Sequence, residues 1–231
     1  MLARALLVLA ACSGALAPTE ATPPEAAAPE ATPPVGAAVC IACRAPAAEP
    51  ARLYSAEDWV ALQDGAVLRQ PVSLEDEESD PSGATRAESL IRRPPANVWT
   101  VLTDFERWPE FMPLIDSTRV ERRAGAKLWV EQRYKIMLMP FGHTTIYDLD
   151  PRDGRLSWNL DEAAPHDIAA SRGAWALLPI GAGQETLVRY DARMSAGRAL
   201  PEFVERMLRD RSLEQMLAGL RAEVLRRFPE H

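Results

Sequence analysis

Few residues in this chain have types and spacings suited to acid–base or metal chemistry. The three histidines are His143, His166 and His231, and their spacing does not match a zinc site, which needs three or four ligands. The sequence contains no nucleophile-elbow, phosphate-loop or dinucleotide-binding glycine motif. A cyclase or hydratase would need an acid or base such as His143, Tyr134 or Asp148 inside a cavity. We therefore predict no catalytic residue, no metal site and no cofactor.

A cysteine pair is the other candidate for chemistry. Cys40 and Cys43 form a C-x-x-C motif inside a proline-rich stretch. In an exported protein, such a pair is a local disulfide, a thiol redox site or half of a metal site. No second C-x-x-C, haem-attachment histidine or thioredoxin-like context accompanies it. We therefore favour a local disulfide between Cys40 and Cys43, or incidental thiols.

The N-terminus has the features of a bacterial export signal. Arg4 precedes a seven-residue apolar run that is too short to span a bilayer and is typical of a signal-peptide core. The L-A-A-C motif ending at Cys12 resembles the lipobox of bacterial lipoproteins, which implies acylation of Cys12. The alternatives are a misplaced start codon or a plain secretory signal, although Pro18 follows the A-L-A site and would hinder that cleavage. We expect residues 1–11 to be a signal peptide. The protein is then a periplasm-facing lipoprotein of a bacterial cell envelope, or is secreted if it is not lipidated.

A linker separates this leader from a domain. Eight of the twenty prolines fall between Pro18 and Pro50, and the sequence E-A-T-P-P occurs twice there. Such a composition has too little large apolar surface to offset chain entropy, so we predict a disordered linker over 12–52. All six tryptophans follow position 58, and we assign 53–231 to one globular domain.

The charge of the chain limits its partners. A net charge of −7 argues against nucleic acid, because nucleic-acid affinity requires a basic surface. The acidic run from Glu75 to Asp80 has consecutive carboxylates without the spacing of a calcium loop, so a solvated loop is favoured. We also expect the protein to be a monomer.

The domain contains mostly β-strand patterns. A short helix capped by Ser55 precedes strands at 66–74 and 84–92, and a proline-led apolar face predicts a helix of about ten residues from 94. Six alternating segments follow, and six successive strands joined by short turns predict an antiparallel meander. These segments are 115–123, 127–139, 144–150, 155–161, 168–178 and 185–194, with turns at 124–125, 140–142, 151–154 and 181–183.

The chain ends in a long predicted helix over 200–228. Pro201 suits its first position, and apolar residues recur at helical spacing in its second half. The apolar face changes direction near residues 209–212. The helix therefore either breaks there or contacts two different surfaces.

The most specific phrase in the sequence lies at 91–113. I-R-R-P-P-A-N-V-W-T-V-L-T-D-F-E-R-W-P-E-F-M-P is similar to the opening of the polyketide cyclase/dehydrase and coenzyme Q-binding branch of the START-like (SRPBCC) superfamily. The resemblance covers residues 66–228 and implies an α+β helix-grip fold, a curved antiparallel sheet wrapped around the long C-terminal helix. It also implies an apolar cavity between them for a lipid, an isoprenoid or quinone, or a polyketide-like ligand. The branch shares no catalytic motif, so no catalytic residue is carried over.

The alternation of the strands indicates which side chains face this cavity. Gln132, Tyr134 and Tyr190 are polar groups on an otherwise apolar wall and are candidates for orienting a ligand. The alternative is that they are ordinary half-buried residues satisfied by backbone or water. The predicted cavity residues are Val101, Val130, Gln132, Tyr134, Ile136, Val188, Tyr190, Met216 and Leu220.

These patterns support one leading hypothesis. The protein is expected to be a non-enzymatic, envelope-anchored lipoprotein that binds a hydrophobic small molecule under its C-terminal helix. A polyketide cyclase/dehydrase-type enzyme and a protein-interaction module are the alternatives.

Overall fold

The structure is a computed structural model that describes residues 53–70, 84–136, 139–195 and 202–230. The predicted signal peptide, Cys12, the linker, and Cys40 with Cys43 lie outside the described residues, so the expectations about them stay predictions. Among the helices that the structure describes, none is both long and apolar enough to cross a membrane.

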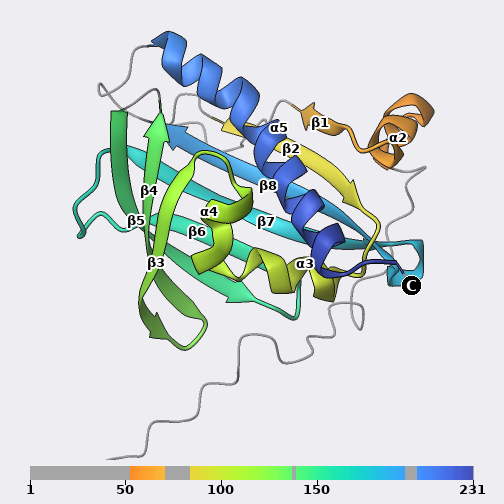
Figure 1. Ribbon diagram of the computed structural model, residues 1–231, viewed down its shortest axis with the longest axis horizontal. Helices are drawn as coiled ribbons and strands as arrows, with labels where there is room; N and C mark the ends of the chain where they lie inside the picture. The colour runs from red at the N-terminus through yellow and green to blue at the C-terminus, as the bar shows by residue number, and fades with distance from the viewer. Residues whose placement is uncertain (1–52, 71–83, 137–138, 196–201, 231) are drawn as a thin grey trace, which may run out of the picture. The chain divides into compact units, whose positions relative to one another are not determined.

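One antiparallel sheet forms the body of the domain. It has eight strands in the order β1-β2-β8-β7-β6-β5-β4-β3 (Figure 1). The six strands β3 to β8 are neighbours in chain order, as the predicted meander requires. The strands are β1 (Val67–Gln70), β2 (Ala84–Ile91), β3 (Ile115–Ala124), β4 (Lys127–Ile136), β5 (Met139–Asp150), β6 (Arg155–Leu160), β7 (Ala170–Ile180) and β8 (Glu185–Ser195). The β1–β2 hairpin is added beside β8, which pairs with β2 from Ala84 to Ile91.

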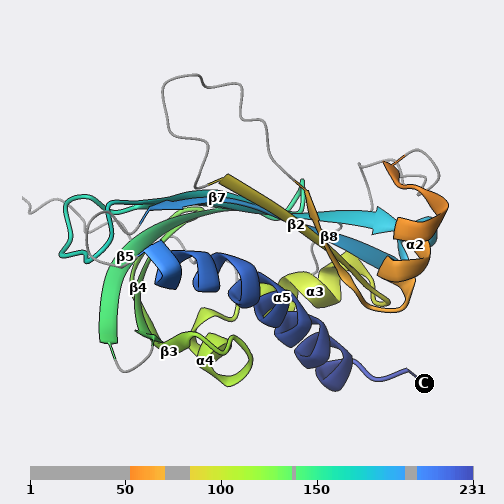
Figure 2. The ribbon, with the colours of Figure 1, turned by 90° about the horizontal axis from the view of Figure 1, so that it is seen from above.

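The sheet curves around three helices on its concave side. Figure 2 shows α5 (Glu202–Arg227) lying along the hollow of the sheet, beside α3 (Pro95–Leu102) and α4 (Trp108–Phe111). A short 3-10 turn, η3 (Phe105–Arg107), joins α3 to α4. The helix α5 is continuous over 26 residues and does not break near 209–212. This arrangement is the predicted helix-grip fold.

Apolar periodicity explains why α5 lies in the hollow. Leu213, Leu217, Leu220 and Val224 recur on one face of the helix, and all four are buried. They pack against the concave faces of the central strands and against α3. Burial of a leucine side chain stabilises the folded state by about 2 kcal/mol, so this face supplies much of the free energy that holds α5 against the sheet.

The helix α2 (Ala56–Gln63) covers part of the opposite, convex face. Ser55 caps it as predicted, with its hydroxyl accepting a hydrogen bond from the Asp58 backbone N–H at 3.1 Å. Leu62 packs with Leu90 and Leu187 in a second, smaller core. The helices are therefore divided between the two faces of the sheet.

One predicted turn is wrong. Pro140, Phe141 and Gly142 lie inside β5, where Phe141 pairs with Tyr134 of β4. Proline is tolerated because β6 pairs with β5 only from Thr145 onward, so this end of β5 lies at an edge of the ladder. A proline therefore does not exclude a strand at a position where the neighbouring strand does not need its backbone N–H.

Candidate functional site

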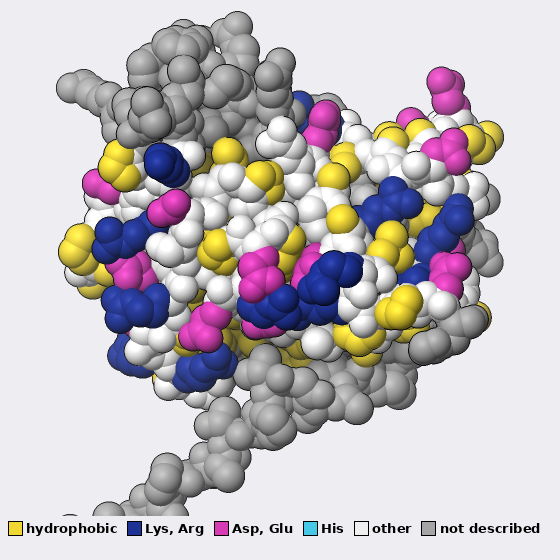
Figure 3. Space-filling view, in the orientation of Figure 1, with side chains coloured by type: hydrophobic (Ala, Val, Ile, Leu, Met, Phe, Trp, Pro, Cys, Tyr) yellow, Lys and Arg dark blue, Asp and Glu magenta, His cyan; other side chains and the backbone are white. Residues whose placement is uncertain are grey.

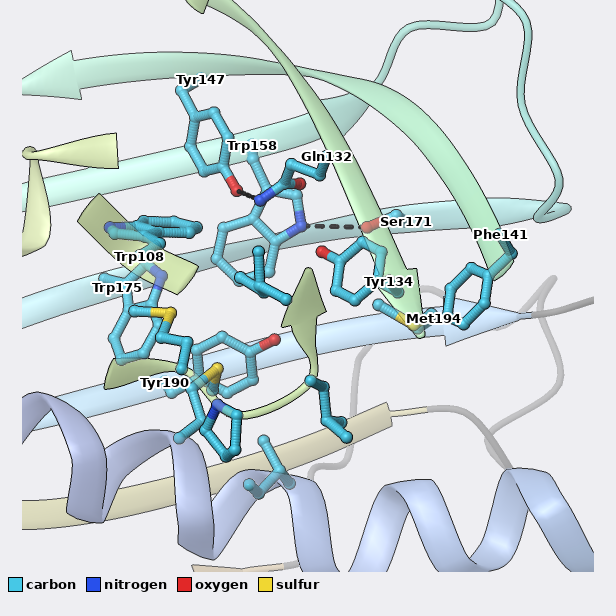
Figure 4. Close-up of a pocket in the computed structure, with 16 residues that line it drawn as sticks. Trp108, Gln132, Tyr134, Phe141, Tyr147, Trp158, Ser171, Trp175, Tyr190 and Met194 are labelled. Atoms are coloured by element: carbon cyan, nitrogen blue, oxygen red, sulfur yellow. Dashed lines mark hydrogen bonds between the residues drawn. The ribbon is translucent and has the colours of Figure 1, made fainter. Parts of the chain in front are cut away.

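A pocket of about 130 Å³ lies between the concave face of the sheet and α5 (Figure 4). Its walls come from α4 and the segment after it, from strands β3 to β8, and from the second half of α5. The lining residues are Trp108, Met112, Pro113, Leu114, Ile115, Gln132, Tyr134, Phe141, Tyr147, Trp158, Ser171, Trp175, Tyr190, Met194, Leu213 and Met216.

The structure brings four of the nine predicted cavity residues to this pocket. They are Gln132, Tyr134, Tyr190 and Met216. Four others lie in the packed core and do not line it, namely Val101, Val130, Val188 and Leu220, each with 0% exposure. Ile136 ends β4, and its side chain lies outside the described part of the chain. Alternation identified the correct face of each strand but not how near each position lies to the hollow.

Five of the sixteen lining residues are aromatic side chains that the sequence analysis did not predict, namely Trp108, Phe141, Tyr147, Trp158 and Trp175. The ring of Tyr190 stacks on Trp158 with a centroid distance of 5.3 Å and meets Trp175 edge-on at 4.6 Å. Trp108 meets Tyr147 edge-on at 5.7 Å. The sequence did carry a signal for Trp158, because apolar and polar residues alternate over 155–160, and the burial of β6 follows that alternation. The same alternation would therefore have placed the aromatic residues of β6 and β7 among the predicted cavity residues.

Gly173 allows the Trp158 ring to lie against the sheet. The two residues are directly paired between β6 and β7. A Cβ atom at Gly173 would lie 2.4 Å from the Trp158 ring and 2.3 Å from the Asp191 carbonyl oxygen. A side chain at this position would push the indole toward the pocket, so this glycine helps to keep the pocket open.

Two buried hydrogen-bond groups fix the polar part of the wall. The Gln132 amide donates to the Tyr147 hydroxyl at 3.1 Å and accepts from the Thr145 hydroxyl at 3.0 Å. The Trp158 indole N–H donates to the Ser171 hydroxyl at 3.2 Å. Because Tyr147 and Ser171 act here as acceptors, their own O–H groups remain available as donors to a ligand.

Two further hydroxyls face the pocket. Figure 4 shows the hydroxyls of Tyr134 and Tyr190 pointing toward its centre. Among the side chains drawn there, no hydrogen bond joins either hydroxyl to another residue. Burial raises the pKa of both phenols well above the usual tyrosine value, so both stay protonated and act as neutral donors.

The described lining contains no carboxylate, histidine, lysine or arginine. His143 lies next to the pocket instead, with its ring stacked on Tyr134 at a centroid distance of 5.4 Å. Burial lowers the pKa of His143 to about 4, so the imidazole is neutral at pH 7. Its Nδ1 has no hydrogen-bond partner among the described residues. The same residues contain no cluster of three potential metal ligands.

Comparison with solved structures shows the same fold in several proteins. A protein from Thermus thermophilus is 23% identical, with a TM-score of 0.56 over 63% of this chain and 99% of the other. The Zhui aromatase/cyclase from Streptomyces sp. R1128 is 19% identical, with a TM-score of 0.54 over 62% and 94%. A STAR-related lipid transfer protein from Xanthomonas axonopodis is 15% identical, with a TM-score of 0.56 over 69% and 93%. These identities establish the fold alone.

Sequence comparison identifies the family. No curated protein shows a significant sequence match to this chain. The model of the family described as "Polyketide cyclase / dehydrase and lipid transport" matches residues 84–225, from the start of β2 to the last turns of α5. That match spans more than half of the chain and includes every wall of the pocket. The chain therefore belongs to the polyketide cyclase/dehydrase and lipid transport family, and it shares its fold with the solved structures above.

Proposed function

We propose that this protein binds a hydrophobic small molecule carrying one or two oxygen groups in the pocket under α5. The observation that carries this proposal is the described lining, which combines aromatic and aliphatic side chains with a few neutral hydroxyls and contains no charged group. A lining of this kind is typical of sites that bury an apolar ligand and orient it by a small number of hydrogen bonds.

The pocket volume limits the ligand. About 130 Å³ is close to the volume of an engineered apolar cavity of about 150 Å³ that holds one benzene molecule. The pocket thus has room for one ring or for a short piece of a longer chain. Met194, with 44% of its surface exposed, and Pro113 place one side of the pocket at the protein surface. A larger ligand therefore has a path along which its remainder can project outward.

The hydroxyl groups define the polar end of the ligand. Tyr134, Tyr190 and Ser171 offer O–H donors from three different strands. A carbonyl or hydroxyl oxygen on the ligand satisfies such donors, whereas a carboxylate would need a positive charge that the described lining does not provide. A phenol, quinone or oxygenated polyketide-like ring meets these requirements.

A cyclase is the second candidate, and the family description and His143 favour it. The neutral imidazole of His143 stacks on the Tyr134 ring next to the pocket, and its Nδ1 has no hydrogen-bond partner among the described residues, so a potential base lies close to the lining. Because His143 does not line the pocket, binding is ranked first. To distinguish the two functions, a polyketide-like compound is incubated with the protein and its mass is then measured. A binding protein leaves the mass unchanged. A cyclase that dehydrates its product lowers the mass by one water, and the Tyr134→Phe variant should no longer form this product.

The test of binding uses two measurements. Solvent extraction of protein purified from the cells that make it, followed by mass spectrometry, should recover a hydrophobic oxygenated molecule. Titration calorimetry with 1-naphthol, a fused ring with one hydroxyl, should show a single saturable site. Met216→Trp fills the pocket from α5 and should weaken 1-naphthol binding at least tenfold. Val60→Trp, on the exposed face of α2, is the matched control and should leave it unchanged. Equal binding by Met216→Trp and wild type contradicts the proposal.

We propose in addition that Cys12 anchors the protein to a membrane, on the support of the L-A-A-C motif and the proline-rich linker after it. Two or three acyl chains make such an anchor effectively permanent. The wild-type protein should then partition into detergent and carry the added acyl mass on its mature N-terminus. Cys12→Ser should lose both properties, and a mature N-terminus at residue 18 would show plain secretion instead.

A further inference from the structure

Three of the four tyrosines of this chain line the pocket under α5. They are Tyr134 of β4, Tyr147 of β5 and Tyr190 of β8, and Ser171 of β7 adds a fourth hydroxyl to the lining. Burial raises the pKa of Tyr147, and the neighbouring Tyr134 and Tyr190 raise it further. The three phenols therefore lie near one another, and each keeps its proton at neutral pH.

The hydrogen-bond partners of two of these hydroxyls fix them as donors. The Trp158 indole N–H donates to the Ser171 hydroxyl at 3.2 Å, and the Gln132 amide N–H donates to the Tyr147 hydroxyl at 3.1 Å (Figure 4). Neither an indole nitrogen nor an amide nitrogen accepts a hydrogen bond in return. Ser171 and Tyr147 therefore direct their own hydrogens elsewhere.

Neither of these two hydrogens has an acceptor among the described residues. The Gln132 carbonyl oxygen already accepts from the Thr145 hydroxyl at 3.0 Å. Both side chains are buried, because only 5% of Ser171 and 4% of Tyr147 is exposed. A buried O–H group without an acceptor is unfavourable, so the pocket favours an occupant that supplies acceptor oxygens.

Charged side chains of the same face lie outside the pocket. Figure 3 shows basic and acidic side chains beside one another on the face that carries the helices. There Arg107 pairs with Glu110 at 2.6 Å, and Arg226 pairs with Glu223 at 2.7 Å. The described lining of the pocket contains no charged group, so the polar atoms of a ligand meet only neutral hydroxyls and the Gln132 amide there.

A ketone and an alcohol differ in what they add to this wall. A carbonyl oxygen brings two acceptor lone pairs and no hydrogen, so it can accept from two hydroxyls. An alcohol adds a further O–H group that needs an acceptor of its own. In the described lining, only the phenol oxygens of Tyr134 and Tyr190 are open to that group, and each of them carries a hydrogen that also needs an acceptor. The wall is therefore better matched to a carbonyl.

We propose that the pocket selects a ligand whose polar group is a ketone carbonyl over the corresponding hydroxyl compound. Tyr147 and Ser171 are the specificity-determining donors, because their partners fix them in that role. Tyr134 and Tyr190 rotate their hydroxyls to suit the ligand. This selectivity rests on the function proposed for the pocket and narrows its ligand from any oxygenated ring to one at the oxidation level of a ketone.

The test is an NMR titration of the full chain with three compounds that share one ring skeleton, 1-indanone, 1-indanol and indane. The Trp158 indole N–H signal reports binding, because this group donates to Ser171. 1-Indanone should bind at least about fivefold more tightly than either enantiomer of 1-indanol. It should also move the indole signal downfield of its position with indane, because a Ser171 hydroxyl that donates to the ligand becomes a stronger acceptor for the indole.

Two variants test the assigned donors. Ser171→Ala and Tyr147→Phe each remove one O–H group from the pocket and should lower the preference for 1-indanone over 1-indanol at least about twofold. Tyr54→Phe is the matched control, because it removes a hydroxyl on the other face of the sheet, where Tyr54 donates to Glu88 at 2.7 Å. It should keep the preference of wild type. Indane binding by each variant shows that the pocket is still formed.

The results separate this selectivity from the binding function on which it rests. If all three compounds bind and 1-indanol binds as tightly as 1-indanone, or more tightly, the carbonyl preference is overturned and the binding function stands. If Ser171→Ala and Tyr147→Phe both keep the wild-type preference, these hydroxyls are not the donors and the proposal fails. If none of the three compounds binds, the binding function and the selectivity are both overturned.

Discussion

At the level of single residues, the pocket divides its polar groups between two tasks. Gln132 uses both ends of its amide to hold Tyr147 and Thr145, so it stabilises the wall. Tyr134 and Tyr190 have hydroxyls directed into the pocket, where they would contact the proposed ligand. The sequence singled out Gln132, Tyr134 and Tyr190 together, and only the hydrogen bonds distinguish their tasks.

Gln132→Leu should destabilise the protein. The leucine fills similar volume but leaves the hydroxyls of Tyr147 and Thr145 without their buried partner, which costs about 1–3 kcal/mol. Urea denaturation measures this loss in the free energy of unfolding. Gln184→Leu, at an exposed turn position, is the control and should stay within about 0.5 kcal/mol of wild type. Equal stabilities of the two variants would show that the Gln132 hydrogen bonds contribute nothing.

His143 should make the protein less stable in mild acid. Burial lowers its pKa from 6.5 to about 4, so between these pH values the unfolded chain binds a proton that the folded protein does not. The free energy of unfolding therefore falls as the pH drops from 6.5 to 4, by roughly 2 kcal/mol between pH 7 and pH 5. Chemical denaturation at these two pH values measures the loss.

His143→Phe is the matched variant for this effect. It keeps a ring against Tyr134 but cannot be protonated, so its stability should fall less than that of wild type over the same interval. His166 and Asp167 are present in both proteins, so the difference between the two curves reports His143 together with its interactions with these neighbours. Parallel curves for the two proteins would mean that His143 is not the titrating group.

At the level of elements, the position of α5 sets the width of the pocket. The helix passes α4 at Gly219, where a Cβ atom would lie 1.9 Å from the Phe111 carbonyl oxygen. At its C-terminal end, Arg227 forms ion pairs with Asp104 at 2.7 Å and with Glu223 at 2.6 Å. Close backbone approach and this ion-pair network together fix the helix over the concave face.

Gly219→Ala should therefore destabilise the protein, although alanine favours helix by about 1 kcal/mol. The new methyl group meets backbone that cannot rotate away, so α4 and α5 must separate, at a net cost of about 1–3 kcal/mol. Thermal or urea unfolding measures this cost, and 1-naphthol affinity should fall with it. The opposite substitution at the exposed neighbour, Ala218→Gly, is the control. It should lower the free energy of unfolding only by the difference in helix propensity, about 1 kcal/mol. A Gly219→Ala protein more stable than wild type would show that α5 is not held this closely.

At the level of the whole molecule, the two faces of one sheet carry different parts of the structure. The concave face holds the long helix and the hydrophobic pocket, and the convex face holds α2 and the smaller core beneath it. The strands β2, β7 and β8 contribute residues to both cores, so they join the two faces.

The predicted domain boundary gives a test at this scale. If 53–231 is the complete folding unit, a protein that begins at Leu53 should unfold in one cooperative transition with a melting temperature equal to that of the longer chain. The physical reason is that a proline-rich segment with little large apolar surface adds no buried area to the core. Differential scanning calorimetry of both proteins measures this. A lower melting temperature for the shorter protein would place part of 12–52 in the folded domain.

The sequence by itself determined the order of the elements and the inward face of the strands, although it placed a turn at 140–142, inside β5. The meander, the cap at Ser55, the long terminal helix and the inward positions Gln132, Tyr134 and Tyr190 all follow from local periodicity, which depends on residues within a few positions of one another. The pairing of β2 with β8 and the packing of α2 on the convex face join residues far apart in the chain, and no local pattern specifies them.

Only the tertiary structure decided where the pocket lies. Val101 and Leu220 have the same inward pattern as Tyr190, yet they pack into solid core, because helix and sheet meet closely at their positions. The hollow remains between the concave face, where the Trp158 ring lies against Gly173, and Leu213 and Met216 of α5. A cavity is the space that packed side chains leave unfilled, so its place depends on the distance between elements, and that distance is set by all the contacts of the fold together.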